Sequence, residues 1–90
     1  MADTLEPAAV RDRLPPHWEL TDGEIVRTYD FESYLQGVEF ATDVARIADE
    51  LDHHPRMVIE FRTVTVAVHS HDVGGITERD LRFADRLAEL

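Results

Sequence analysis

The stretch Asp49-Glu50-Leu51-Asp52-His53-His54-Pro55 joins the end of a long amphipathic segment to two adjacent histidines and a proline. Proline disfavours helical geometry in the residue before it, so a helix is predicted to end here and His54 to be extended. Histidine is the side chain whose ordinary pKa suits proton transfer near neutrality. This corner therefore combines a change of chain direction with groups suited to acid-base chemistry.

The segment before this corner has the periodicity of a helix that covers a sheet. Asp30 is a candidate N-cap, and polar side chains fall mainly between the apolar positions. Apolar residues recur at three- and four-residue steps at Phe31, Tyr34, Leu35, Val38, Ala41, Val44, Ala45, Ala48 and Leu51.

The segment after the corner alternates as two strands do. Met57 to Phe61 and Val64 to Val68 are predicted strands, with a tight connection near Arg62-Thr63. If the second strand continues without a bulge, His69 and His71 lie on the face opposite the valines. One face of this hairpin would then pack, while the other meets a ligand or a subunit.

The chain before residue 30 is predicted to form a short helix and a hairpin. Thr4 is a candidate cap of the helix, Val10 and Leu14 face inward, and Pro15-Pro16 stops it. The Asp22-Gly23 turn then separates a short extended segment, which contains Trp18 and Leu20, from alternating residues 25–31.

The end of the chain is predicted to be a loop and a helix. Gly74-Gly75 marks the loop, and Thr77 caps the helix with Glu78 and Asp80 in its first turn. The order α-β-β-α-β-β-α predicts one α+β domain over residues 1–90, a four-stranded antiparallel sheet with three helices on one face.

The composition limits the environment and the partners. Ninety residues carry 19 acids and nine bases, all of them arginine, for a formal charge of −10. Such a chain is repelled by phosphate backbones and anionic membranes, so neither nucleic acid nor a membrane is an expected partner. Dispersed acids without lysine suggest a halophilic source as a hypothesis. A small core favours self-association, and the absence of cysteine, a signal segment and a spanning segment favours a cytoplasmic protein.

The candidate site consists of His53, His54, His71 and Asp49. Asp49 precedes His53 by four residues, close enough along a last helical turn to accept a hydrogen bond from an imidazole. Imidazoles with an orienting carboxylate suit acid-base catalysis without a cofactor. The same groups could bind zinc, although adjacent histidines are awkward ligands for one ion, so no metal is expected.

These residues resemble the motif of the pterin-4a-carbinolamine dehydratase family. The family pattern is an acid, three residues, His-His-Pro, an aromatic residue, a later histidine and a later aspartate. The matching residues are Asp49, His53-His54-Pro55, Phe61, His71 and Asp80, and the resemblance extends from about Trp18 to the C-terminus.

The resemblance implies a function and a set of roles. Members of the family dehydrate 4a-hydroxytetrahydropterins, such as that of tetrahydrobiopterin, to quinonoid dihydropterins, and they form dimers or tetramers. His53, His54 and His71 would be catalytic with Asp49 in support, and Trp18 and Phe61 would line the pterin pocket. No cofactor is implied.

Other interpretations remain open. Animal members of the family also act as dimerisation partners of a transcription factor, so a non-catalytic interaction module is one alternative, and a pterin-binding role in molybdopterin-related metabolism is another. Asp80 is explained by helix capping alone, and Trp18 and Phe61 are equally suited to a core. His17 and His69 are expected on the surface.

Overall fold

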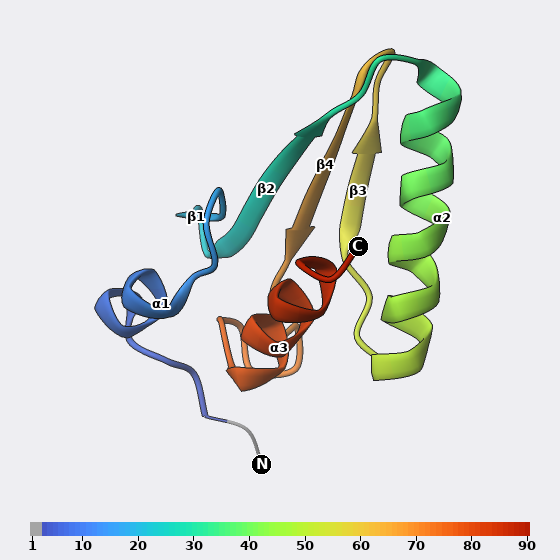
Figure 1. Cartoon of the computed structure of the whole chain (residues 1–90). Helices are drawn as coiled ribbons and strands as arrows, with labels where there is room; N and C mark the ends of the chain where they lie inside the picture. Colours follow the sequence, from blue (N-terminus) through green and yellow to red (C-terminus); the bar gives the residue numbers. More distant parts are fainter. Residues whose placement is uncertain (1–2) are drawn as a thin grey trace.

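The computed structural model describes residues 3–90, which form three helices and four strands (Figure 1). The order α-β-β-α-β-β-α and the α+β class agree with the prediction from sequence. The elements are α1 (Pro7–Arg13), β1 (Glu19–Thr21), β2 (Glu24–Asp30), α2 (Tyr34–Leu51), β3 (Arg56–Ile59), β4 (Thr63–Val68) and α3 (Glu78–Leu87).

The four strands form one antiparallel sheet in the order β1-β2-β4-β3. The central pair runs from Ile25 opposite Val68 to Asp30 opposite Thr63. As predicted, Asp22 and Gly23 form the turn between β1 and β2, and both have positive φ angles, 50° and 79°. Glycine adopts this conformation without steric cost, and aspartate tolerates it.

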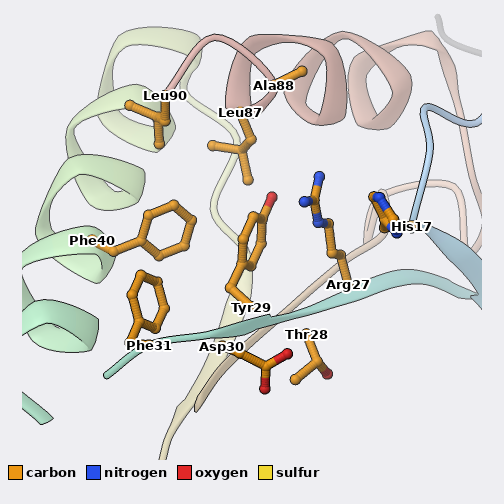
Figure 2. A pocket seen from close by; sticks show the side chains of 10 residues that line it. All are labelled: His17, Arg27, Thr28, Tyr29, Asp30, Phe31, Phe40, Leu87, Ala88 and Leu90. Atoms are coloured by element: carbon orange, nitrogen blue, oxygen red, sulfur yellow. The ribbon is translucent and has the colours of Figure 1, made fainter. Parts of the chain in front are cut away.

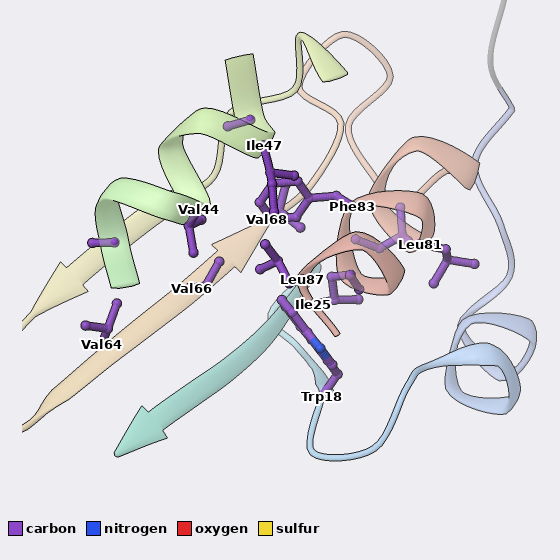
Figure 3. Packing of buried hydrophobic residues seen from close by; sticks show 14 of the residues in the cluster. Trp18, Ile25, Val44, Ile47, Val64, Val66, Val68, Leu81, Phe83 and Leu87 are labelled. Carbon is purple, nitrogen blue, oxygen red and sulfur yellow. The ribbon is translucent and has the colours of Figure 1, made fainter. Parts of the chain in front are cut away.

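The core lies between one face of the sheet and the helices (Figure 3). The valines of β4 and Ile25 of β2 meet apolar residues of α2 and α3, and Val10 of α1 joins the same cluster. The strand and helix periodicities thus converge on one apolar layer. Its labelled members are Trp18, Ile25, Val44, Ile47, Val64, Val66, Val68, Leu81, Phe83 and Leu87.

Helix α2 begins later than the sequence suggested. Asp30 is the last residue of β2 rather than an N-cap, and the Phe31 N–H donates to the Arg62 carbonyl at 2.8 Å. Ser33 is the N-cap, and its hydroxyl accepts a hydrogen bond from the Gln36 N–H at 3.2 Å. Because β2 pairs with β4 as far as Asp30, the chain is still extended at this first candidate cap, and the helix begins only after Ser33.

The end of α2 depends on Asp52 as well as on the proline. Asp52 lies in the left-handed region at φ 51°, and its N–H and that of His53 both reach the Ala48 carbonyl. This turn satisfies the last carbonyl groups of the helix and reverses the chain before Pro55 is reached. The two histidines therefore lie outside the helix, in the link to β3.

Two smaller predictions need correction. Thr4 does not cap α1: the N-cap residue is Glu6, no side chain bonds there, and Pro7 starts the helix. The strand predicted from Met57 to Phe61 is shifted to Arg56–Ile59. Phe61 instead lies in the β3–β4 turn and is 72% exposed.

Helix α3 has the predicted cap. Thr77 and Asp80 form a capping box, in which the Thr77 N–H donates to Asp80 Oδ2 at 2.9 Å. Both residues are buried, and the isolated bridge between Ser70 and Gly75 closes the preceding loop. Through Ser70, which contacts both Thr77 and Asp80, this buried cap joins the start of α3 to the loop that follows β4. Across residues 3–90, no helix combines the length and apolar content needed to cross a bilayer.

Candidate active site

A cavity of about 310 Å³ lies where the α2–β3 link, the loop after β4 and the start of α3 meet. It combines imidazoles from two separate segments with acidic and basic groups at its edge. Its lining residues are Asp52, His53, His54, His69, His71, Asp72 and Arg79. The three histidines predicted to act together therefore share one cavity.

His53 is the buried member of this set, and a buried carboxylate holds it. Its Nε2 lies 2.5 Å from Asp80 Oδ1, and Asp80 is completely buried. The second carboxylate oxygen, Oδ2, accepts hydrogen bonds from the Ser70 hydroxyl at 2.8 Å and from the Thr77 N–H. A buried anion requires several partners, and these contacts provide them.

The contact with Asp80 determines which ring nitrogen of His53 donates a hydrogen bond and which one accepts. Because a carboxylate only accepts hydrogen bonds, the bonding pattern assigns the proton to Nε2. In the neutral ring, Nδ1 is then the nitrogen that can take up a proton. Asp80 holds the ring in this orientation. Phe83 contacts the ring edge-on, with the ring centres 6.4 Å apart.

His54 is the solvent-facing neighbour. Its side chain is 58% exposed, and its Nε2 lies 3.0 Å from Asp49 Oδ1. Asp49 does support an imidazole, as its position suggested, but the imidazole belongs to His54 rather than to His53. Both partners are exposed, so this pair is weaker than the buried His53–Asp80 pair.

His71 and His69 form the wall contributed by the loop after β4. Their ring centres are 4.0 Å apart, so the two side chains do lie on one side of the chain. His69 Nδ1 lies 3.3 Å from Glu24 Oε2, and Arg56 donates to Glu24 Oε1 at 2.9 Å. Glu24 therefore links Arg56 of β3 to the His69 ring, which lies beside His71.

Arginine partners shift the pKa values of two carboxylates, Asp72 in the cavity lining and Glu24, which contacts the lining residue His69. The hydrogen bond from Arg56 lowers the pKa of Glu24, against the opposing effect of its burial. The hydrogen bond from Arg79, 2.5 Å long, lowers the pKa of Asp72. Both carboxylates are thus held in their charged form at neutral pH.

Two predicted pocket residues do not line this cavity. Trp18 is 6% exposed and packs in the core beside Ile25 and Leu87 (Figure 3). Phe61 is exposed at the turn between β3 and β4. Among residues 3–90, no group of three histidine, aspartate or glutamate side chains has an arrangement that could hold a metal ion.

Other cavity residues were not identified from sequence. His69, expected on the surface, is half-buried in the cavity wall, and Arg79 and Asp72 form an ion pair at the edge of the cavity. Asp80, which the sequence predicts to cap α3, does so and also binds the lining residue His53. The signal that could have identified it was already present, because a capping carboxylate has a second oxygen free for another partner.

The family comparison covers nearly the whole chain. Residues 3–90 match the family model described as Pterin 4 alpha carbinolamine dehydratase. A protein of Natronomonas pharaonis with the provisional name pterin-4-alpha-carbinolamine dehydratase is 46% identical over 90 residues, which are 100% of this chain and 98% of the relative. A Haloarcula marismortui protein with the same provisional name is 45% identical over 87 residues, 97% of this chain and 95% of the relative.

Solved structures share the fold. The crystal structure of a transcriptional coactivator/pterin dehydratase from Brucella melitensis superposes with a TM-score of 0.88, at 25% identity and 97% coverage of both chains. A pterin dehydratase-like protein identified as a RuBisCO assembly factor in the alpha-carboxysome has a TM-score of 0.63, at 20% identity, with 80% and 83% coverage.

The fold and the histidine cavity together define a small α+β domain of the pterin dehydratase type. The chain belongs to the pterin-4α-carbinolamine dehydratase family, because the family model and full-length relatives agree on it.

Proposed function

We propose that this protein is a hydro-lyase that converts a 4a-hydroxytetrahydropterin into a quinonoid dihydropterin and water. The observation that carries the proposal is the meeting of His53, His54 and His71 around one cavity, with His53 bonded to a buried carboxylate. Family membership supports the pterin as substrate.

The reaction needs one acid and one base and no external reactant. The C4a–O bond breaks as the departing hydroxyl group receives a proton and leaves as water, while N5 loses a proton and a C4a=N5 double bond forms. The proton gained and the proton lost balance. Two imidazoles on different sides of a flat ring can perform both transfers.

The three histidines differ in ways that suit different steps. His53 is fixed by Asp80, which stabilises the positive charge that its ring acquires when it accepts a proton. His54 and His71 are exposed and can exchange protons with water. Asp49 supports His54. We therefore assign His53, His54 and His71 to proton transfer and Asp49 to orientation.

The test is an assay that generates the 4a-carbinolamine and follows its dehydration. His53→Ala, His54→Ala and His71→Ala should each lower kcat/KM, with the losses reaching about 100-fold or more for a general acid or base. His17→Ala is the matched control, because His17 lies outside this cavity. Wild-type rates equal to the uncatalysed rate would refute the proposal for that substrate.

The assay also separates two alternatives. A pterin-binding protein of molybdopterin-related metabolism would bind a pterin in the histidine cavity without accelerating dehydration. An interaction module, suggested by the coactivator description of the Brucella protein, would neither bind nor turn over pterins. Binding of 7,8-dihydropterin measured by calorimetry beside the kinetic assay therefore distinguishes the three functions.

We propose also that the protein is a homodimer or homotetramer. The β3–β4 turn lies beside the start of α2 (Figure 1), and large apolar side chains are exposed in both of these segments and in β3. Exposed large apolar residues favour burial in an interface. Light scattering should give a multiple of the 10.3 kDa chain mass, and a monomeric mass at all concentrations would contradict this. The residues are Tyr34, Leu35, Val58, Ile59 and Phe61.

A further inference from the structure

A second and larger cavity lies on the helix-covered side of the sheet, between β2, α2 and the end of α3 (Figure 2). Its volume is about 550 Å³, within the usual range of small-molecule sites. It shares no lining residue with the histidine cavity. Any ligand that it takes is therefore separate from the proposed substrate. The lining residues are His17, Arg27, Thr28, Tyr29, Asp30, Phe31, Phe40, Leu87, Ala88 and Leu90.

One side of this cavity is aromatic. Phe40 lies between Tyr29 and Phe31, with ring centres 4.4 Å and 5.2 Å away. Figure 2 shows these rings side by side, with Leu87 and Leu90 above them. A flat apolar body gains both buried area and ring contacts against such a wall.

The other side holds the Arg27 cation, which has no acidic partner among residues 3–90. The Arg27 guanidinium lies 4.2 Å from the centre of the Tyr29 ring, and its Nε is buried with no hydrogen-bond partner in residues 3–90. The Tyr29 hydroxyl group is buried and unpartnered in the same way. Acids within the described chain pair with Arg13, Arg46, Arg56, Arg79 and Arg86, and the other arginines that lack such a pair there, Arg11, Arg62 and Arg82, are exposed, unlike Arg27.

Neither of the two acids nearest in sequence, Glu24 and Asp30, pairs with Arg27, and Glu24 contacts Arg56 and His69 instead. Figure 2 shows the Asp30 and Thr28 side chains on the other side of β2, as strand alternation requires, while Arg27 and Tyr29 point into the cavity. Burial raises the pKa of Tyr29 more than the neighbouring Arg27 lowers it, so the hydroxyl group keeps its proton and can donate it in a hydrogen bond. The cavity thus offers one positive charge and two hydrogen-bond donors, Arg27 Nε and the Tyr29 hydroxyl group, that have no partner within residues 3–90.

We propose that this cavity binds a small organic anion with a flat apolar body and a single carboxylate. Arg27 and the Tyr29 hydroxyl group hold the carboxylate, and the Tyr29, Phe31 and Phe40 rings contact the body. A single negative charge fits better than a phosphate dianion, because the cavity has one guanidinium and also faces the negative end of α3 at Leu87 and Ala88.

The test is an NMR titration of the full-length ¹⁵N-labelled protein with 3-phenylpropionate. Saturable shifts are expected at the amides of Arg27, Phe40 and Leu87, and not at those of His53 and His71. The neutral analogue 3-phenylpropanamide should bind about tenfold or more weakly, because it lacks the charge that Arg27 pairs with.

Variants then test the assigned contact. Arg27→Gln should weaken 3-phenylpropionate binding about tenfold or more while leaving the amide's affinity unchanged, and Arg27→Lys should give an intermediate loss. Arg82→Gln is the matched control, because Arg82 is exposed on α3 and does not line the cavity. Circular dichroism confirms that each variant folds.

Three results would overturn the proposal. They are equal affinity for the acid and the amide, shifts confined to the histidine cavity, and no saturable binding by the wild-type protein. In the last case, a change of mass on Arg27→Gln in light scattering would show that a second copy of the chain covers the cavity instead. None of these results depends on dehydratase activity.

Discussion

Asp80 shows how one side chain can serve the fold and the site at once. Its Oδ2 completes the cap of α3, and its Oδ1 holds His53. Helix capping explained the residue fully from sequence, so spacing alone could not reveal the second contact. Only the packing of the α2–β3 link against α3 brings His53 to the free oxygen.

Asp80→Asn should separate these two roles in part. The amide keeps the size of the side chain but removes the negative charge that stabilises a protonated His53. We expect kcat/KM of the proposed dehydration to fall about 10- to 100-fold and the free energy of unfolding to fall by about 1–3 kcal/mol. Kinetics and urea unfolding measure the two effects.

Asp85→Asn is the control on the same helix, because Asp85 is exposed and makes no side-chain hydrogen bond among residues 3–90. It should change neither quantity measurably. If Asp80→Asn were also without effect on kcat/KM, Asp80 would be a cap only.

Glu24 gives a prediction about pH. Its pKa is lowered in the folded chain by Arg56, so its charged form stabilises the fold above the unfolded value of 4.5, and this contribution is lost as pH falls through the lower folded value. Glu24→Gln should therefore cost about 0.5–1 kcal/mol at pH 7 and progressively less below about pH 4.5.

Chemical unfolding of wild type and Glu24→Gln at pH 7 and pH 3 measures this difference. Glu19→Gln, on the neighbouring strand β1, provides a control with the same loss of charge at an exposed position. A Glu24→Gln effect of equal size at both pH values would show that packing, not the ion pair, sets the cost.

At the scale of elements, the parts that could be predicted are those where periodicity and local chemistry agree. The Asp22-Gly23 hairpin, the apolar stripe of α2 and the Thr77 cap are of this kind. The start of α2 is not, because Asp30 and Ser33 are both good caps. Pairing of Asp30 with Thr63, a contact between residues far apart in sequence, decides between them.

This correction can be measured. Ser33→Ala should lower the free energy of unfolding by about 1 kcal/mol, because the Gln36 N–H loses its acceptor. Asp30→Ala should have a much smaller effect, since Asp30 is exposed and caps nothing. Urea unfolding of both variants compares them directly, and the reverse order of losses would mean that α2 begins at Asp30 after all.

At the scale of the whole molecule, the sequence could predict which histidines meet at one cavity, but not the contacts that each of them makes there. The sequence contains both the His53-His54-Pro55 corner and His71, and periodicity places them on adjacent elements. The left-handed turn at Asp52 decides that Asp49 supports His54. The loop after β4 decides that His69 joins the cavity wall beside His71. Neither has a periodic signal.

The charge of the molecule leads to the last prediction. Nineteen acids against nine arginines leave an excess of ten negative charges on 90 residues, and this excess repels itself more strongly in the compact fold than in the open chain. Salt at about 1 M shortens the screening length to about 3 Å and removes most of that repulsion between exposed groups. Relatives from Natronomonas and Haloarcula share up to 46% of the sequence.

We therefore expect the thermal midpoint at pH 7 to rise by several degrees between about 0.1 M and about 2 M potassium chloride. The control is the same pair of salt concentrations near pH 4, where many carboxylates are protonated and less repulsion remains to be screened. The salt effect should shrink there. An equal midpoint at both concentrations at pH 7 would contradict the halophilic hypothesis, whereas an equal rise at both pH values would assign the stabilisation to stronger apolar burial in salt rather than to charge.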